Sequence, residues 1–275
     1  MELTAVLTTL DDYNGLTRVL LSLEGEADSA VVLVPEDGRS HYIEAACPIP
    51  CTVKEGELPG LAATRNRGAE IADGDVVAFL DDDVVVEDGW GEALKIAFRG
   101  GARAAGGPAV PAWETSRPAF LPERWDWLVG CGPYHDTRTV VRNTYGCNIA
   151  FDADTFEELG GFDESYGFDG DLGQGEEAEL CGRMADEFGC GTEYMPDAIV
   201  HHHVPATKAA PRRLLKRCWA QGRTKARMGV GDEEEDFLVE AVLYALKEKP
   251  MGTLGSFAYL GATGFGYLSE RIRQY

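Results

Sequence analysis

The sequence is short of basic residues: 25 lysines and arginines stand against 47 aspartates and glutamates, and the formal net charge is −22. An acidic surface of this kind repels a phosphate backbone, so we expect no nucleic-acid partner. Strong acidity with little lysine keeps a protein soluble in concentrated salt, where charge repulsion is screened. We therefore interpret the composition as that of a halophilic cytoplasm. A protein that binds many cations is the less favoured alternative, because the acids are dispersed.

Paired cysteines and long apolar runs are also missing. The seven cysteines are odd in number and include no Cys-x-x-Cys pair, which indicates reduced thiols instead of a disulfide framework or a zinc site. No stretch is long and apolar enough to predict a transmembrane helix. Met1 is followed at once by a strand-like run, so we expect no signal peptide and a cytoplasmic location.

In the first third of the chain, strand-like apolar runs alternate with amphipathic helical patterns. The β-rich runs occupy residues 3–9, 30–38 and 75–80. An amphipathic helix is predicted after the first run and another helix at 60–74. Strand, helix, strand, helix, strand is the pattern of an α/β fold with a mainly parallel sheet flanked by helices. Residues 108–137 are rich in Pro and Trp and show no regular spacing of apolar residues. This stretch is either a loop over a ligand or a packed structural loop.

Three adjacent aspartates, Asp81, Asp82 and Asp83, follow the apolar run that ends at Leu80. In open parallel sheets, ligands bind beyond the carboxyl ends of the strands. Adjacent carboxylates raise one another's pKa, and a hard divalent cation such as Mg²⁺ or Mn²⁺ removes that conflict while retaining sites for phosphate oxygens. The motif alone is equally compatible with a metal–phosphate site and with a solvated acidic turn.

The wider stretch GLAATRNRGAEIADGDVVAFLDDDVVVEDGW closely resembles the GT-A (Rossmann-like) glycosyltransferases of family 2. The resemblance implies that Asp81 and Asp83 are the Asp-x-Asp pair, with Asp83 the direct ligand of Mn²⁺ or Mg²⁺ and Asp81 nearer the ribose or the metal's waters. Asp82 lies within the same donor-binding motif. Arg65 matches the arginine that faces the nucleotide, and Asp37 stands where the family reads the base, although Pro35 and Glu36 depart from the usual double Asp.

A second acidic cluster opens a helical pattern at residues 173–189. At 100° per residue, one apolar stripe emerges with Glu177 at its centre and Glu176 to its side; the stripe comprises Leu180, Cys181, Met184, Ala185 and Phe188. A carboxylate on the inward side of a first helical turn either caps the helix or is held for proton transfer. NTYGCNIAFDADTFEELGGFDE followed by GEEAELCGR resembles the same family, which implies that Glu177 is the catalytic carboxylate, with Glu176 the alternative base.

Three of the five histidines stand together in PDAIVHHHVPA. On an extended segment His201 and His203 share one side and His202 the other. The resemblance selects His202, before VP, as the histidine that approaches the metal or the diphosphate. A surface cluster is a reasonable interpretation of the other two.

The C-terminal part, which we delimit as 206–275 after a catalytic domain at 1–205, is predicted to be helical. Eight lysines and arginines and no acid lie between Ala206 and Gly231. A basic helix with a Trp–Leu face suits a membrane surface or a phosphate-bearing acceptor, although a core-packed helix is the alternative. The candidate acceptor or membrane residues are Trp113, Arg212, Arg213, Lys216, Arg217 and Trp219. The uncharged segment 250–268 is either interfacial or packed on the domain.

These patterns, together with the resemblance to family 2, predict a metal-dependent glycosyltransferase that is peripheral to the inner face of the cell membrane. The resemblance implies transfer with inversion. The Pro- and Trp-rich stretch followed by VGCGPY and GCNIAF resembles the branch of the family that extends dolichyl-phosphate-linked N-glycans. This resemblance implies a nucleotide-diphosphate sugar donor, a dolichyl-phosphate-linked saccharide acceptor, and transfer of a hexose or hexuronic acid, glucuronic acid above all. Two alternatives remain. Asp81 to Val85 also fits the DxDxV motif of haloacid-dehalogenase-like sugar phosphatases, although some eighty residues precede it, and a non-catalytic sugar-binding module would need no base.

Overall fold

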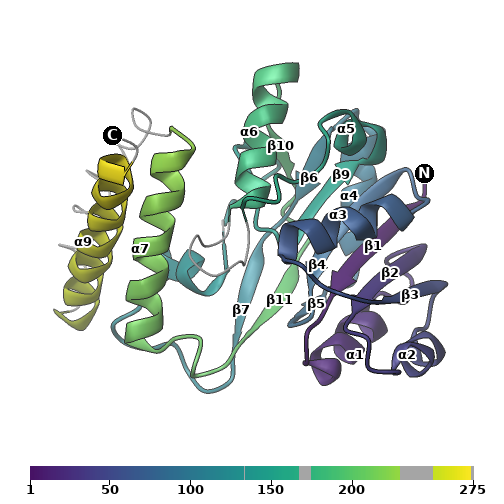
Figure 1. Ribbon diagram of the computed structural model, residues 1–275, viewed down its shortest axis with the longest axis horizontal. Coiled ribbons are helices and arrows are strands. Elements are labelled where there is room, and N and C mark those ends of the chain that lie inside the picture. Colours follow the sequence, from purple (N-terminus) through teal and green to yellow (C-terminus); the bar gives the residue numbers. More distant parts are fainter. Residues whose placement is uncertain (133, 167–174, 230–249, 274–275) are drawn as a thin grey trace. The chain divides into compact units, whose positions relative to one another are not determined.

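The computed structural model describes residues 1–132, 134–166, 175–229 and 250–273 (Figure 1). The chain divides into two compact units. The first comprises Met1–Val110, Gly132–Ser165 and Glu176–His202, and the second comprises Pro111–Cys131, Tyr166–Gly175 and His203–Tyr275.

The first unit is built on an eight-stranded sheet with the strand order β3-β2-β1-β4-β9-β6-β10-β8. The strands are β1 (Leu3–Thr8), β2 (Ser29–Val34), β3 (Cys51–Glu55), β4 (Val76–Asp81), β6 (Ala104–Gly106), β8 (Thr139–Val141), β9 (Asn148–Asp152) and β10 (Thr192–Tyr194). The first four in the order are parallel, and β10 is parallel to β6. Only β9 and β8 run antiparallel to their neighbours. The predicted, mainly parallel sheet is confirmed.

The alternation of side chains along β4 builds a core on each face of this sheet. Val76, Ala78 and Leu80 belong to one core, with helices α1 (Tyr13–Ser22), α2 (Ser40–Ala46) and α4 (Trp90–Arg99). Val77 and Phe79 belong to the other, with α3 (Leu61–Ile71), α5 (Ala153–Glu158) and α6 (Glu176–Phe188). Because both faces of β4 are covered, its apolar run is continuous and does not alternate with polar residues.

A smaller sheet of three strands has the order β5-β11-β7. Its strands are β5 (Val84–Val86), β7 (Ala109–Trp113) and β11 (Val200–Val204). Two residues separate the end of β4 from the start of β5, and β5 pairs antiparallel with β11 so that Val84 lies opposite His202. This register brings the histidine segment to the aspartate turn.

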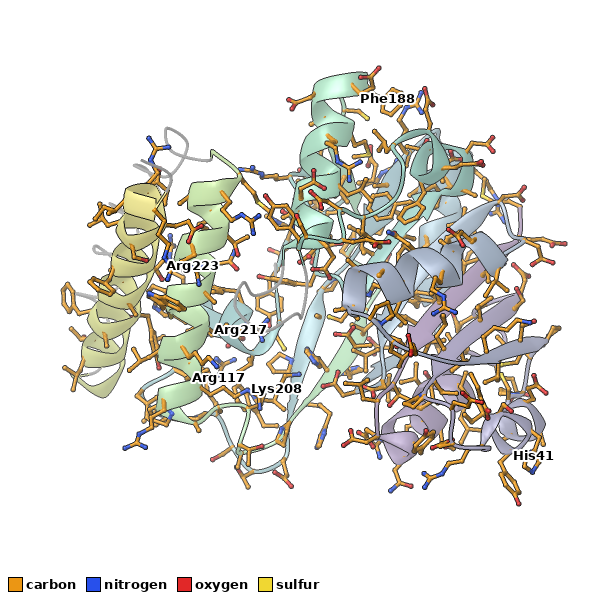
Figure 2. All side chains as sticks on the ribbon, viewed as in Figure 1. His41, Arg117, Phe188, Lys208, Arg217 and Arg223 are labelled. Atoms are coloured by element: carbon orange, nitrogen blue, oxygen red, sulfur yellow. The ribbon has the colours of Figure 1, made fainter. Side chains whose placement is uncertain are left out.

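The second unit is helical. It contains the 3-10 helix η1 (Glu123–Val129) and two long helices, α7 (Pro211–Arg227) and α9 (Pro250–Arg273). Helices α7 and α9 lie side by side (Figure 1). Glycines allow the two long helices to approach closely: a Cβ on Gly222 would lie 2.0 Å from the carbonyl oxygen of Thr263, and one on Gly266 would lie 2.0 Å from that of Trp219. Arg223 bridges them through Glu270, with Nε 2.7 Å from Oε2 (Figure 2).

The extents of the two units differ from the predicted segments 1–205 and 206–275. Pro111–Cys131 groups with the C-terminal helices because Leu121, Trp125 and Leu128 share one buried cluster with Leu214 and Cys218. The helical character of the C-terminal part is confirmed at α7 and α9. Residues 230–249 of that predicted segment lie outside the described residues.

Candidate active site

The aspartates lie where the parallel strands end. β1 and β4 are in parallel register with Thr8 opposite Asp81, so their carboxyl ends share one edge of the sheet. The hydroxyl of Thr9 donates a hydrogen bond to the carboxylate of Asp82, which fixes the turn after β4. Burial raises the pKa of Asp82 to about 6, and the negative charges of Asp83 and Asp81 add to this shift.

His202 lies beside these aspartates. Its Nε2 is 3.0 Å from Oδ1 of Asp83, and one donor atom each of Asp81, Asp83 and His202 lies within 4.8 Å of the others. The imidazole is buried, whereas the carboxylates of Asp81 and Asp83 are 35% and 23% exposed. The structure thus brings Asp81, Asp83 and His202 together at the end of β4.

This donor set fits a divalent cation. Two carboxylates supply the hard oxygen ligands that Mg²⁺ and Mn²⁺ prefer, and imidazole nitrogen is a common additional ligand for transition metals. Partial exposure of both carboxylates leaves one side of the cluster open to a substrate. Without a cation the three aspartates would concentrate negative charge at one strand end, and a bound cation compensates it.

Arg65, expected to face the nucleotide, is instead buried, with 2% of its side chain exposed. Its Nη2 lies 2.6 Å from Oδ1 of Asp81 and 2.7 Å from the carbonyl oxygen of Gly146, and its Nη1 lies 2.7 Å from Oε1 of Glu176. The guanidinium therefore joins the aspartate turn to the first turn of α6.

The two glutamates at the start of α6 differ in environment. Glu176 is buried and ion-paired with Arg65, whereas Glu177 is half-buried. Burial raises the pKa of Glu177 to about 8, and the negative charge of Glu176 contributes. The predicted apolar stripe holds at Leu180, Cys181 and Met184, and Phe188 is partly buried against the same core, but Ala185 is exposed.

Asp37 stands after β2 and contacts two residues that the sequence did not single out. The hydroxyl of Tyr13 donates to Oδ2 of Asp37 at 2.6 Å, and the guanidinium carbon of Arg39 lies 4.4 Å above the Tyr13 ring. Burial and the hydrogen bond to Asp37 together raise the pKa of Tyr13 to about 12. The position of Tyr13 at the start of the helix after β1 is the signal that could have identified it.

Two asparagines brace the site, Asn148 fully buried and Asn66 half-buried. Oδ1 of Asn148 accepts from Nε1 of Trp90 at 2.9 Å, and its Nδ2 donates to the carbonyl oxygen of Ala198 at 2.8 Å, just before β11. Asn66, next to Arg65, exchanges two hydrogen bonds of 2.9 Å with the backbone of Phe162. Their roles depend on long-range contacts, which sequence spacing alone does not reveal.

The residues predicted to contact the acceptor or a membrane lie in the second unit. Arg212, Arg213 and Lys216 are exposed on α7, while Arg217 and Trp219 are half-buried. Trp113 is half-buried, with the guanidinium carbon of Arg117 5.2 Å from its ring centroid. Arg217 and Arg117 are labelled in Figure 2.

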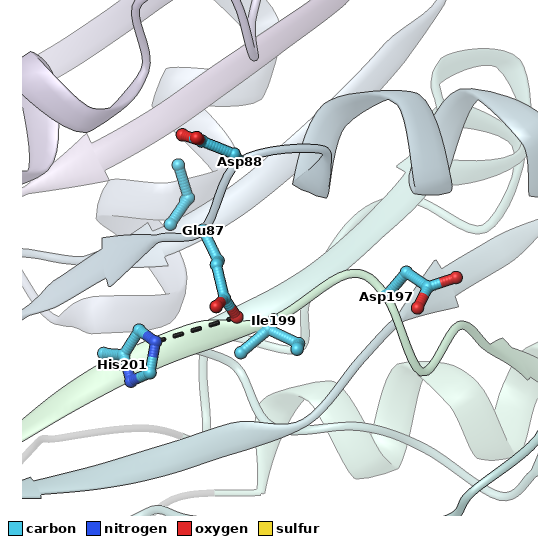
Figure 3. A pocket seen from close by; sticks show the side chains of 6 residues that line it. Glu87, Asp88, Asp197, Ile199 and His201 are labelled. Atoms are coloured by element: carbon cyan, nitrogen blue, oxygen red, sulfur yellow. Dashed lines mark ion pairs between the residues drawn. The ribbon is translucent and has the colours of Figure 1, made fainter.

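A pocket of about 480 Å³ lies on the other side of the histidine strand (Figure 3). Its lining residues are Val86, Glu87, Asp88, Asp197, Ile199 and His201. Nε2 of His201 is 3.7 Å from Oε2 of Glu87. The pocket contains none of the predicted site residues, and it demonstrates the expected alternation, since His201 lines it while His202 is buried beside Asp83.

The comparisons with known proteins agree with this geometry. The family model described as Glycosyl transferase family 2 matches residues 35–158. A glucosyl-dolichyl phosphate glucuronosyltransferase of Haloferax volcanii is 34% identical over 234 residues, which cover 77% of this chain and 75% of that protein. The chain belongs to glycosyltransferase family 2. A second relative of this family 2 enzyme, the pre-mycofactocin glycosyltransferase of Mycobacterium tuberculosis, is 29% identical over 73% of the chain, but the chain spans only 42% of its length.

Solved structures support the fold of this family 2 glycosyltransferase. A mannosyltransferase from Pyrobaculum calidifontis, solved with GDP-Man and Mn²⁺, superposes with a TM-score of 0.59 at 18% identity, over 97% of this chain and 87% of that one. The predicted GT-A fold is thereby confirmed. Membership of family 2 confirms the predicted glycosyltransferase activity and sets aside the phosphatase and the non-catalytic module. Among the described helices of the enzyme, none has the length and apolarity needed to span a bilayer.

Proposed function

We propose that the enzyme transfers glucuronic acid from a nucleotide-diphosphate sugar to a saccharide carried on dolichyl phosphate, with inversion. The observation that carries this proposal is the 34% identity to the Haloferax volcanii glucosyl-dolichyl phosphate glucuronosyltransferase, which extends along three quarters of both chains. A hexose donor is the alternative, since pocket contacts that distinguish two sugars can be few.

Glu177 is the proposed general base. A half-buried carboxylate with a raised pKa accepts a proton more readily than an exposed one. It takes the proton of an acceptor hydroxyl while that oxygen bonds to the anomeric carbon and the bond from that carbon to the diphosphate breaks. Glu176, the alternative base, is already ion-paired with Arg65, and this supports Glu177.

Asp81, Asp83 and His202 are the proposed ligands of Mn²⁺ or Mg²⁺. When bound, such a cation supplies Lewis-acid neutralisation of the departing diphosphate. Asp82, held by Thr9, keeps the turn in place, and Asp37 with Tyr13 and Arg39 would contact the nucleoside. The cluster around Asp37 offers both a hydrogen-bonding and an aromatic surface, which suits a base and its ribose.

The membrane surface is the proposed location of the acceptor. Five large apolar side chains of α9 are exposed in spite of the packing on α7: Leu254, Phe257, Phe265, Leu268 and Ile272. Exposed basic residues at the start of α7 complement anionic lipid headgroups, and they stand out in a chain of net charge −22. An amphipathic helix of this type lies in the interface without crossing it.

The test is a transfer assay with glucosyl-phospho-dolichol in vesicles and a panel of UDP and GDP sugars, in Mn²⁺ or Mg²⁺ and in molar KCl to match the acidic composition. We expect a product heavier by one hexuronic acid, detected by mass spectrometry, from one donor only. A product heavier by a hexose would overturn the assignment of the sugar. No product from any donor would overturn the proposed acceptor.

A further inference from the structure

The buried guanidinium of Arg65 forms ion pairs with both the aspartate turn and the start of α6. It lies 2.6 Å from Asp81 and 2.7 Å from Glu176. A third bond of 2.7 Å reaches the carbonyl oxygen of Gly146, before β9. Arg65 therefore joins three parts of the chain that are distant in sequence.

Two glycines create the space for this contact. A Cβ on Gly68, one turn further along α3, would lie 2.4 Å from Cγ1 of Val6, so the glycine allows α3 to sit directly on β1. A Cβ on Gly146 would lie 2.7 Å from Nη1 of Arg65. The backbone thus approaches the guanidinium more closely than any other residue would permit.

These contacts oppose a direct role in holding the nucleotide. The side chain is 2% exposed, and both Nη atoms already donate to buried or half-buried acceptors. To reach a donor, Arg65 would have to leave two carboxylates, of which Glu176 is itself 2% exposed. Uncompensated burial of a carboxylate is strongly unfavourable, so the pairing persists.

We propose that Arg65 is a positioning residue that orients Asp81 for the cation and anchors Glu176, so that the metal ligands and Glu177 keep a fixed separation. This inference rests on the proposed function. A planar guanidinium is suited to the task because its fork of donors holds two carboxylates at once, whereas the lysine ammonium is a point charge. Groups that orient metal ligands are known to change metal affinity without touching the metal.

The first experiment measures Mn²⁺ affinity of the full chain without nucleotide, by titration with detection of free Mn²⁺ by electron paramagnetic resonance. Arg65→Lys keeps the charge but loses the fork, and we expect Mn²⁺ affinity to fall about ten-fold or more. UDP and GDP affinities at saturating Mn²⁺ should stay within about two-fold of wild type, since no nucleotide contact is lost. Arg67→Lys is the matched control on the same helix. Arg67 is exposed and donates to the backbone oxygen of Glu57, so this variant should leave both affinities unchanged.

Gly146→Ala tests the same point if Arg65→Lys fails to fold, because it displaces the guanidinium while keeping the arginine. It should lower Mn²⁺ affinity in the same way. Glu176→Gln should retain Mn²⁺ affinity, because Arg65 still holds Asp81, and lower kcat, because the start of α6 loses its anchor. Unchanged Mn²⁺ affinity in both Arg65→Lys and Gly146→Ala, or a loss of nucleotide affinity alone, would overturn the inference. Neither binding measurement depends on sugar or acceptor, so failure of the proposed transfer would be recognised separately.

Discussion

Nε2 of His202 lies 3.0 Å from Oδ1 of Asp83 because Val84 and His202 are directly paired across β5 and β11. The strand pairing, and not the local sequence of either segment, brings the imidazole to the aspartate turn. The same pairing directs the side chain of His201 away from the aspartates, since His201 lines the pocket on the opposite side of β11.

Asp83→Ala should abolish cation-dependent nucleotide binding. Removal of a direct ligand should cost more than the loss of an orienting partner, so we expect affinity for UDP or GDP in Mn²⁺ to fall by more than about 100-fold. Isothermal titration with and without Mn²⁺ measures this. His201→Ala removes a histidine next to the proposed ligand and should bind as wild type does. Equal Mn²⁺-dependent affinity in Asp83→Ala would refute the metal assignment.

The sequence was sufficient for the elements whose signal is local. The apolar run of β4, the helix at 60–74 and the aspartates are contiguous, and the structure has β4 at Val76–Asp81 and α3 at Leu61–Ile71. The environment of Arg65 was not predictable in the same way, because it depends on Glu176 and Gly146, which reach it only through the packing of α6 and β9. The same holds for Asn148, whose partners come from α4 and from the chain before β11.

Short strands also escaped prediction for a physical reason. β6 and β10 have three residues each, so an alternating pattern has no room to appear, and their stability comes from the neighbouring strands. Alternation along a strand separated His202 from His201 and His203, but it did not indicate which side faces the site. The resemblance to family 2 was needed to select His202.

Glu177→Gln should bind donor normally and lose transfer. The amide keeps the size of the side chain but cannot accept the acceptor's proton, and loss of a general base typically costs 10²- to 10⁴-fold in kcat. The measurement is kcat for transfer alongside nucleotide affinity in Mn²⁺. Asp186→Asn changes an exposed carboxylate on the same helix and should remain fully active. Full activity in Glu177→Gln would move the base to another residue.

The pH dependence of transfer should reflect the raised pKa of Glu177. A base must be deprotonated, so activity should be low in mild acid and should rise with pH towards about 8, the pKa to which burial and Glu176 raise this carboxyl. The profile of kcat/KM against pH measures it. A carboxylate with an ordinary pKa would make kcat/KM rise near pH 4.5, and such a rise would contradict the assigned environment of Glu177.

The exposed face of α9 predicts where the enzyme meets lipid. Phe265 and Leu268 are 69% and 60% exposed and lie one turn apart, so replacing both with aspartate should leave the packing on α7 intact while placing charge in the lipid interface. We expect the double variant to lose sedimentation with phosphatidylglycerol vesicles, while activity on a short-chain soluble acceptor is retained. Tyr42→Asp, at a residue 68% exposed on α2, is the control for an added surface charge and should sediment as wild type does. If the double variant sediments equally well, lipid is not what this face binds, and a protein partner or another segment of the chain would have to cover it.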